Sequence, residues 1–172
     1  MIPALLYVSF KKKLFKKPSY KDNYCLLKDR PSNKYLFAFD IDNTLTCRDS
    51  KSVIEMVRKR SDCDIALVTA RPVWPVDIDI RTVRNINLPS ENNVTTCYRP
   101  FESRDSVEKV KLDQLLKISK DYDRVFFFDD MYRTINHIDT YLKQNNIDNI
   151  TTYYIPRCNT FEYVKRITMN LS

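Results

Sequence analysis

Acidic side chains follow two apolar segments of the chain, at the points where those segments end. Asp40 and Asp42 lie at and just after the end of the first apolar segment, residues 35–41. Asp129 and Asp130 directly follow a later one, residues 124–128. Side chains two positions apart on an extended segment point the same way, so Asp40 and Asp42 project side by side. Several carboxylates in one place require a cation, and oxygen-only ligands suit Mg²⁺. The pattern predicts a Mg²⁺ site formed by Asp40, Asp42, Asp129 and Asp130.

These residues can support phosphoryl transfer. With a reference pKa of about 3.9, Asp40 is ionised at neutral pH and can attack phosphorus without an activating base. Asp42 can protonate the leaving oxygen and then deprotonate the water that hydrolyses the intermediate. Thr69 offers a hydroxyl to the phosphoryl oxygens, and a lysine of the following helix offers a positive charge. Lys111 is favoured because it stands four residues before Leu115, with Lys109 as the alternative.

The elements that position these residues alternate along the chain. Short runs rich in β-branched and aromatic residues occur at residues 35–41, 64–69, 93–98, 124–128 and 150–155 and are typical of strands. Between and after them lie segments with helical spacing of apolar residues, near residues 53–57, 72–86, 112–118, 135–142 and 161–167. Five strands alternating with five helices predict a three-layer α/β fold with a five-stranded parallel sheet. In such sheets functional groups gather at the carboxyl ends of the strands.

The ordered motifs resemble those of the haloacid dehalogenase (HAD) superfamily. They are the run from Phe37 through Asp40-Ile41-Asp42-Asn43-Thr44, the run ending in Thr69, the helix-borne lysine, and the run ending in Asp129-Asp130. The resemblance implies a Rossmann-like sheet, with Mg²⁺ held by Asp40, by the backbone carbonyl of Asp42 and by an aspartate of the last run. Of the two aspartates in that run, Asp129 is favoured over Asp130 as the direct metal ligand. The second aspartate, Asp42, marks the phosphatase branch. Asn43 departs from the glycine that many members carry.

The resemblance also bears on the substrate. The intervals from Asp40 to Thr69 and from Thr69 to Lys111 leave no room for the cap domain of many members. Capless relatives tend to act on large substrates, such as nucleic acid ends or phosphoproteins, or to use a partner as the cap. Residues 1–34 form a basic arm with 9 Lys or Arg against 2 Asp or Glu, whereas residues 35–172, the predicted catalytic domain, are balanced. In size and lack of a cap, the chain is similar to the phosphatase domain of polynucleotide kinase-phosphatases. Together with the basic arm, this likeness favours a phosphorylated nucleic acid end as substrate, with another large substrate as the alternative.

Other functions remain open at this point. Besides nucleic acid binding, the arm is consistent with a solvated tail, an anionic membrane surface or nuclear import. Clustered acids at strand ends also serve metal-dependent nucleases, and a non-catalytic protein could present only the arm. The absence of glycine excludes Walker A and GxGxxG loops, and the lone His137 excludes a multi-histidine metal site. Trp74 and Tyr98 follow two strands and could stack a base.

The five cysteines are widely spaced, odd in number and form no CxxC pair. This usage is typical of unpaired thiols in a reducing compartment, so we expect no disulfide framework and a cytoplasmic location, with the nucleus as the alternative. The apolar stretch of residues 2–10 is much shorter than the ~20 residues of a membrane span, so no transmembrane segment is expected.

Overall fold

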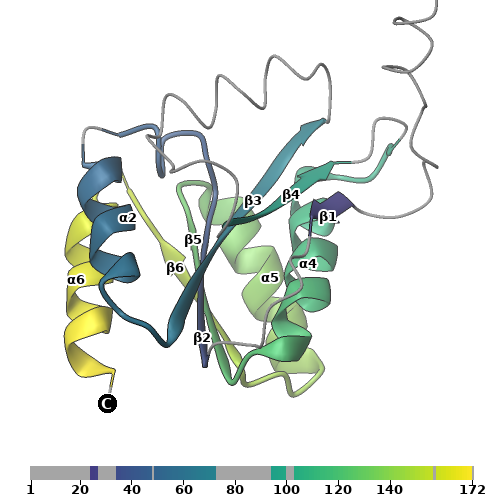
Figure 1. The fold of residues 1–172 in the computed structure, drawn as a ribbon. Coiled ribbons are helices and arrows are strands. Elements are labelled where there is room, and N and C mark those ends of the chain that lie inside the picture. Colours follow the sequence, from purple (N-terminus) through teal and green to yellow (C-terminus); the bar gives the residue numbers. More distant parts are fainter. Residues whose placement is uncertain are drawn as a thin grey trace, which may run out of the picture.

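The computed structural model describes residues 24–26, 34–47, 49–72, 94–99, 103–156 and 158–171. These residues form one mixed sheet with helices on both faces (Figure 1). The strands are β1 (Tyr24–Leu26), β2 (Tyr35–Phe39), β3 (Cys63–Pro72), β4 (Val94–Arg99), β5 (Arg124–Asp129) and β6 (Ile150–Tyr154). The helices are α2 (Ser50–Arg58), α4 (Val107–Ile118), α5 (Tyr132–Gln144) and α6 (Thr160–Asn170), with a short 3₁₀ turn at Ser119–Asp121.

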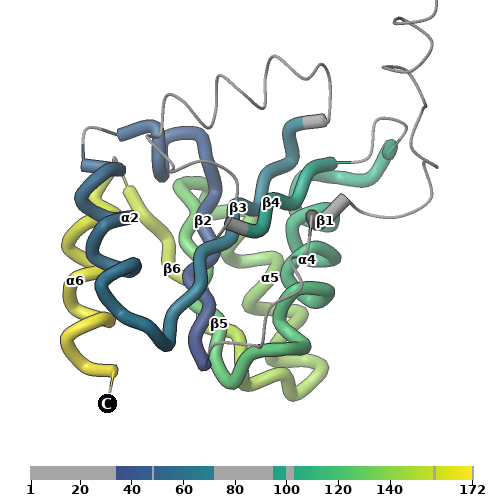
Figure 2. Tube along the Cα trace, in the orientation of Figure 1, coloured from purple at the N-terminus to yellow at the C-terminus, as the bar shows by residue number. Residues whose placement is uncertain are grey.

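The sheet contains the five predicted parallel strands. Its order is β1-β4-β3-β2-β5-β6, so the first strand of the parallel set, β2, lies in the middle between β3 and β5 (Figure 2). β1 pairs antiparallel with β4 at one edge and comes from the segment that the sequence assigned to the basic arm. The α/β prediction is confirmed, and the described residues form no second domain. The helix predicted within residues 72–86 lies outside the described residues.

The two faces of the sheet are covered by different helices. Strand side chains alternate between faces, so Phe37 and Phe39 pack on the side of α2 and α6, whereas Leu36 and Ala38 pack on the side of α4 and α5 (Figure 1). All residues of β2 are buried. Burying an aromatic or aliphatic side chain stabilises the fold by about 1.5–3 kcal/mol. The buried side chains of β2 therefore fix the position of this strand and of the residues that follow it.

The cysteine prediction was wrong. Cys47, in the loop after β2, forms a disulfide with Cys158, just before α6, at a Cα–Cα distance of 5.5 Å. Cys97 is also disulfide-bonded, and Cys63 is the free cysteine of the described residues. The sequence could not show the disulfide between Cys47 and Cys158, because these residues are 111 positions apart and only the fold brings their loops together. A disulfide that closes a loop of this length stabilises the fold by about 4–5 kcal/mol in the chain-entropy model.

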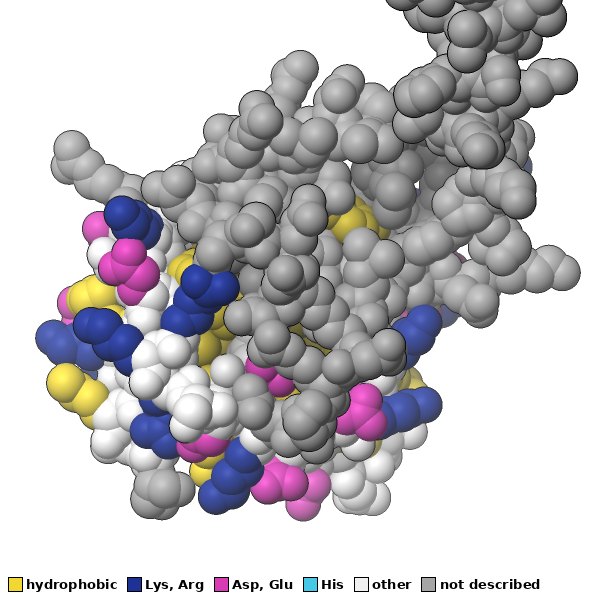
Figure 3. Space-filling view, viewed as in Figure 1, with side chains coloured by type: hydrophobic (Ala, Val, Ile, Leu, Met, Phe, Trp, Pro, Cys, Tyr) yellow, Lys and Arg dark blue, Asp and Glu magenta, His cyan; other side chains and the backbone are white. Residues whose placement is uncertain are grey.

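The surface of the described residues mixes charges of both signs. Figure 3 shows Lys and Arg side chains interspersed with Asp and Glu on the visible face of the described part. Within that part, no helix has the length and apolar character needed to cross a bilayer.

Candidate active site

Asp40 and Asp129 lie together at the carboxyl ends of the two central strands, β2 and β5. Phe39 pairs in register with Phe128, and the Asp40 amide donates a hydrogen bond to the Phe128 carbonyl at 2.9 Å. The Asp129 carbonyl accepts from the Ile155 amide, also at 2.9 Å. By the alternation of the strands, both carboxylates project on the face covered by α4 and α5. Asp40 is 4% exposed and Asp129 is fully buried.

Lys111 joins the two carboxylates. Its Nζ donates to Asp40 Oδ1 and to Asp129 Oδ2, each at 2.7 Å, and the residue is 2% exposed. The alternative, Lys109, lies on the exposed side of α4 and pairs with Asp105 at 2.9 Å. The helix begins at the Ser106 cap, whose side chain accepts from the Lys109 amide, and this start places Lys111 on the inner face. Of the two predicted lysines, the structure therefore brings Lys111 to the carboxylates.

Burial and mutual interaction shift the pKa values of this group. Loss of solvation raises the pKa of Asp40 to about 6, while the adjacent Lys111 works to lower it. Burial likewise raises the pKa of Asp129. Burial works to lower the pKa of Lys111, but the carboxylates of Asp40 and Asp129 outweigh this effect and raise it. Two buried carboxylates thus share one ammonium, which leaves an excess of negative charge that a further cation would neutralise.

Asp130 completes a group of three carboxylates that could hold a metal ion. One ligand oxygen from each of Asp40, Asp129 and Asp130 lies within 4.8 Å of the others. The Met131 amide donates to Asp129 Oδ1 at 2.8 Å, and Asn43 Nδ2 donates to Asp130 Oδ2 at 3.0 Å, so both carboxylates are oriented by neighbours. A donor set made only of carboxylate oxygens fits a hard divalent cation such as Mg²⁺.

The structure places the Asp42 carboxylate outside this group. Arg71 binds it through Nε at 2.8 Å and through a second contact from Nη2, and this pairing raises the pKa of Arg71. Arg71 also donates its backbone N–H to the Thr69 hydroxyl at 3.1 Å. That hydroxyl still has its own proton to donate. Asp42 and Arg71 are both partly exposed, whereas Asp40, Asp129 and Lys111 are buried. The Asp42–Arg71 pair is therefore accessible to solvent beside the buried group.

Asn43 has a conformation that explains its position in the motif. It has a φ of 54°, in the left-handed region where glycine is favoured and where asparagine is the best tolerated of the other residues. Its backbone N–H donates to Thr46 Oγ1 at 2.9 Å. The same turn is closed by the Ile41 carbonyl, which accepts hydrogen bonds from the backbone N–H groups of Leu45 and Thr46. Asparagine therefore keeps the turn and adds the side-chain contact to Asp130, a contact that the sequence did not indicate.

Several contacts near the site were not predicted from the sequence. Gln114, one turn after Lys111 and fully buried, donates from Nε2 to the Thr69 carbonyl at 3.2 Å and so fixes the end of β3 against α4. Tyr98 is 5% exposed and belongs to the core, and Trp74 lies outside the described residues. Among the described residues, the exposed aromatic side chains beside the site are instead Tyr132 and Tyr154, neither of which the sequence pattern singled out.

Comparison with known proteins gives a likeness in fold. No protein-family model matches the sequence, and no curated protein matches it. Among solved structures, a chain of the Pnkp1/Rnl/Hen1 complex is similar, with a TM-score of 0.54 and 14% sequence identity. The match covers 84% of this chain and 52% of that one, so the present chain spans about half the length of the similar protein. At this identity the likeness concerns the fold: a Rossmann-like parallel α/β sheet shared with a chain of that complex.

Proposed function

We propose that this chain is a Mg²⁺-dependent phosphatase that hydrolyses a phosphomonoester through an aspartyl-phosphate on Asp40. The observation that carries the proposal is the buried contact of Lys111 with Asp40 and Asp129, beside Asp130. A purely structural role is a poor account of this group, because a buried lysine between two carboxylates has a desolvation cost that can exceed its Coulombic gain. Perturbed ionisable groups gathered at strand ends are typical of catalytic sites.

Each residue has a definite part in this reaction. Lys111 holds Asp40 through Oδ1, so Oδ2 is the oxygen that attacks phosphorus and forms the new O–P bond while the bond to the leaving oxygen breaks. Lys111 and the Thr69 hydroxyl donate to the phosphoryl oxygens. Mg²⁺, held by Asp40, Asp129 and Asp130, would supply charge stabilisation for those oxygens when bound.

Asp42 would serve as the general acid and then as the general base. Its carboxylate lies on Arg71, so this pair has to separate before Asp42 can reach the leaving oxygen. A substrate phosphate is a competing anion for the Arg71 guanidinium, whose planar set of donors suits phosphate as well as carboxylate. In this proposal the arriving phosphate therefore takes Arg71 and releases Asp42, which takes up a proton from solvent before it donates that proton to the leaving oxygen.

A nucleic acid end is the substrate class that we favour. The support is the basic segment of residues 1–34, whose Lys and Arg side chains could hold a phosphate backbone. The fold likeness to a chain of the Pnkp1/Rnl/Hen1 complex is consistent with this class. The basic cluster at residues 11–17 lies outside the described residues, so this step rests on sequence.

Phosphate release tests the proposal. Purified protein would be assayed with Mg²⁺ and with EDTA on an aryl phosphate, a 3′-phosphorylated oligonucleotide and a phosphopeptide. Asp40→Asn keeps the size of the side chain but removes the nucleophile, and Asp121→Asn is the matched control because Asp121 is exposed in the 3₁₀ turn. We expect Mg²⁺-dependent release that Asp40→Asn abolishes and Asp121→Asn preserves.

Other outcomes would contradict the proposal. Shortened oligonucleotides without free phosphate would indicate a nuclease. Binding of oligonucleotides without any turnover, lost when Lys11, Lys12, Lys13, Lys16 and Lys17 are changed to glutamine in the full chain, would indicate a non-catalytic protein that acts through the arm. Release that Asp40→Asn leaves unchanged would refute the aspartyl-phosphate mechanism.

A further inference from the structure

An exposed aromatic pair lies beside the candidate active site. Among the described residues, the large apolar side chains that are exposed are Met131 (43%), Tyr132 (65%), Tyr154 (40%) and Met169 (73%). The first three belong to the carboxyl ends of β5 and β6 and the start of α5. The rings of Tyr132 and Tyr154 meet edge to face, with centroids 5.7 Å apart and an angle of 83° between their planes. Both residues thus present aromatic surface to solvent.

The pair is tied directly to the carboxylates. Tyr154 pairs in register with Asp129, one strand spacing of about 4.8 Å away, and by alternation both project on the same face of the sheet. Tyr132 follows Asp130 by two residues, and the intervening Met131 donates its amide to Asp129. Tyr153, by contrast, stacks on Phe128 in the core on the opposite face. Tyr132 and Tyr154 are thus positioned by the same backbone that positions the metal-binding group.

We propose that Tyr132 and Tyr154 form a stacking platform for the nucleobase adjacent to the phosphate that this site removes. The inference rests on the proposed phosphatase function and specifies its substrate as a nucleotide or nucleic acid end. Bases of any kind present a flat face that stacks on aromatic side chains, so the platform gives affinity without sequence selectivity. The phosphate on Lys111 and the base on the tyrosines would be neighbouring parts of one nucleotide.

The size of the patch favours a base over a second copy of the chain. A stable protein–protein interface buries about 800 Å² on each partner and involves roughly 20–30 residues a side. The described apolar patch consists of Met131, Tyr132 and Tyr154. The exposed surface of three side chains is closer in size to one planar ring system than to such an interface.

A pair of substrates that differ in one base tests the platform. The first is a 3′-phosphorylated trinucleotide, and the second is the same molecule with an abasic sugar at the phosphorylated end. For the wild-type protein we expect a lower KM on the first. Tyr132→Ala or Tyr154→Ala should raise that KM about 5- to 100-fold, the range expected from the loss of one stacking contact. The KM for the abasic substrate should not change, and kcat should change little on either substrate.

Controls separate stacking from structural damage. Tyr132→Phe and Tyr154→Phe keep the ring and should behave as wild type. Met169→Ala removes another large exposed side chain, on α6 and outside the site, and should also have no effect. Equal KM values of the wild-type protein for the two substrates would overturn the platform, and so would alanine variants that impair both substrates equally. A dimer in sedimentation that Tyr132→Ala converts to monomers would assign the patch to a second copy instead.

A binding measurement keeps the two proposals distinguishable. Fluorescence anisotropy of a labelled trinucleotide, with EDTA present, requires no catalysis. If no substrate releases phosphate but Tyr132→Ala weakens binding about 5- to 100-fold while Tyr132→Phe does not, the phosphatase proposal fails and the platform stands. If phosphate is released and neither alanine variant changes binding or KM, the platform fails and the phosphatase stands.

Discussion

Replacing Lys111 with methionine removes the ammonium between Asp40 and Asp129 while keeping an unbranched side chain of similar length. Both carboxylates then lose the 2.7 Å contacts to Nζ and remain buried. Their mutual repulsion is no longer compensated, and each carboxylate has lost a charged hydrogen-bond donor. We expect a large loss of stability in the metal-free protein, and we expect Mg²⁺ to restore a substantial part of it, because the cation supplies positive charge to the same oxygens.

The magnitude follows from the burial of the group. Removing one partner of a buried ion pair costs about 3–5 kcal/mol, since the remaining charge is left uncompensated. For a chain of this size, each kcal/mol lowers Tm by about 2–4 °C, which gives a decrease of roughly 6–20 °C. Without Lys111 the pKa of Asp40, already about 6, rises further. Proton uptake then limits the penalty, so the decrease in Tm should be smaller at pH 5 than at pH 8.

Thermal unfolding by circular dichroism measures this effect, in EDTA and in Mg²⁺, at pH 5 and pH 8. Lys109→Met is the matched control, because it removes the same group two positions away from an exposed pair with Asp105. Exposed pairs contribute little, so Tm of the control should stay near that of the wild type. A Lys111→Met protein as stable as the control in EDTA would refute the reasoning. A variant that Mg²⁺ stabilises no more than it stabilises the wild type would refute the metal assignment.

Three further predictions concern stability. The pKa of Asp40 in the folded state, about 6, is above its unfolded value of about 3.9, so protonation of Asp40 favours the folded state. This contribution of about 2–3 kcal/mol is full below pH 4 and is lost as pH rises through 6. Urea unfolding of the metal-free wild type across this pH range should show the loss, whereas Asp40→Asn should not. Cys47→Ser opens the bond to Cys158 and should lower the free energy of unfolding by about 2–5 kcal/mol under oxidising conditions. Urea unfolding measures this loss; a reductant should destabilise the wild type at least as much, because it also opens the disulfide of Cys97, and a variant as stable as the wild type would contradict the role of the bond. Asn43→Gly keeps the left-handed turn and loses only the contact to Asp130, whereas Asn43→Ala also has the steric cost of about 1–2 kcal/mol of a positive φ. The Tm of Asn43→Gly should therefore exceed that of Asn43→Ala, and the reverse order would contradict the role given to the turn.

The sheet and the meeting of its acidic ends were predictable because both follow from local patterns. Uninterrupted apolar runs such as residues 125–128 indicate strands buried on both faces, and strands of that kind belong to parallel sheets. Parallel strands end at a common edge, so Asp40 and Asp129 were expected at the same edge of the sheet. They are direct neighbours because β2 pairs with β5, a strand order that local patterns do not give. The helix containing Lys109 and Lys111 was also recognisable, but its inner face depends on where the cap at Ser106 lies.

The contacts that the sequence did not reveal are those between loops. The bond between Cys47 and Cys158 joins two loops on different elements, and nothing in the residues around either cysteine indicates the other. The pairing of Arg71 with Asp42 is similar, because a carboxylate expected to face the metal lies instead on a side chain from the next strand. Loop conformation depends on tertiary contacts, whereas strands and helices follow from periodicity within one segment.

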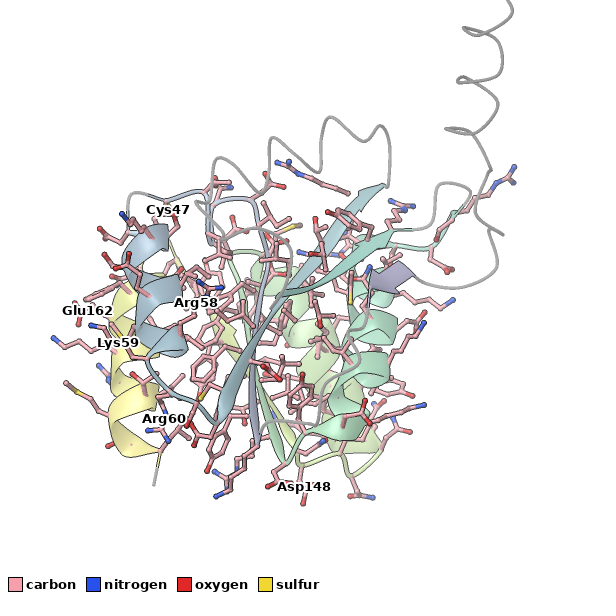
Figure 4. The ribbon with its side chains drawn as sticks, viewed as in Figure 1. Cys47, Arg58, Lys59, Arg60, Asp148 and Glu162 are labelled. Carbon is pink, nitrogen blue, oxygen red and sulfur yellow. A yellow bond between two sulfur atoms is a disulfide. The ribbon has the colours of Figure 1, made fainter. Side chains whose placement is uncertain are left out.

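The bond between Cys47 and Cys158 also makes most of the chain a closed covalent ring. Cys47 lies at the end of the molecule where the parallel strands terminate, opposite Arg60 and Asp148 (Figure 4). Thr69, Lys111 and Asp129 belong to the ring, whereas Asp40 lies on the segment that enters it. A protease that cuts the backbone once between the two cysteines therefore produces no separate fragments. The site residues remain on one molecule after such a cut, and only a reductant divides it into two chains.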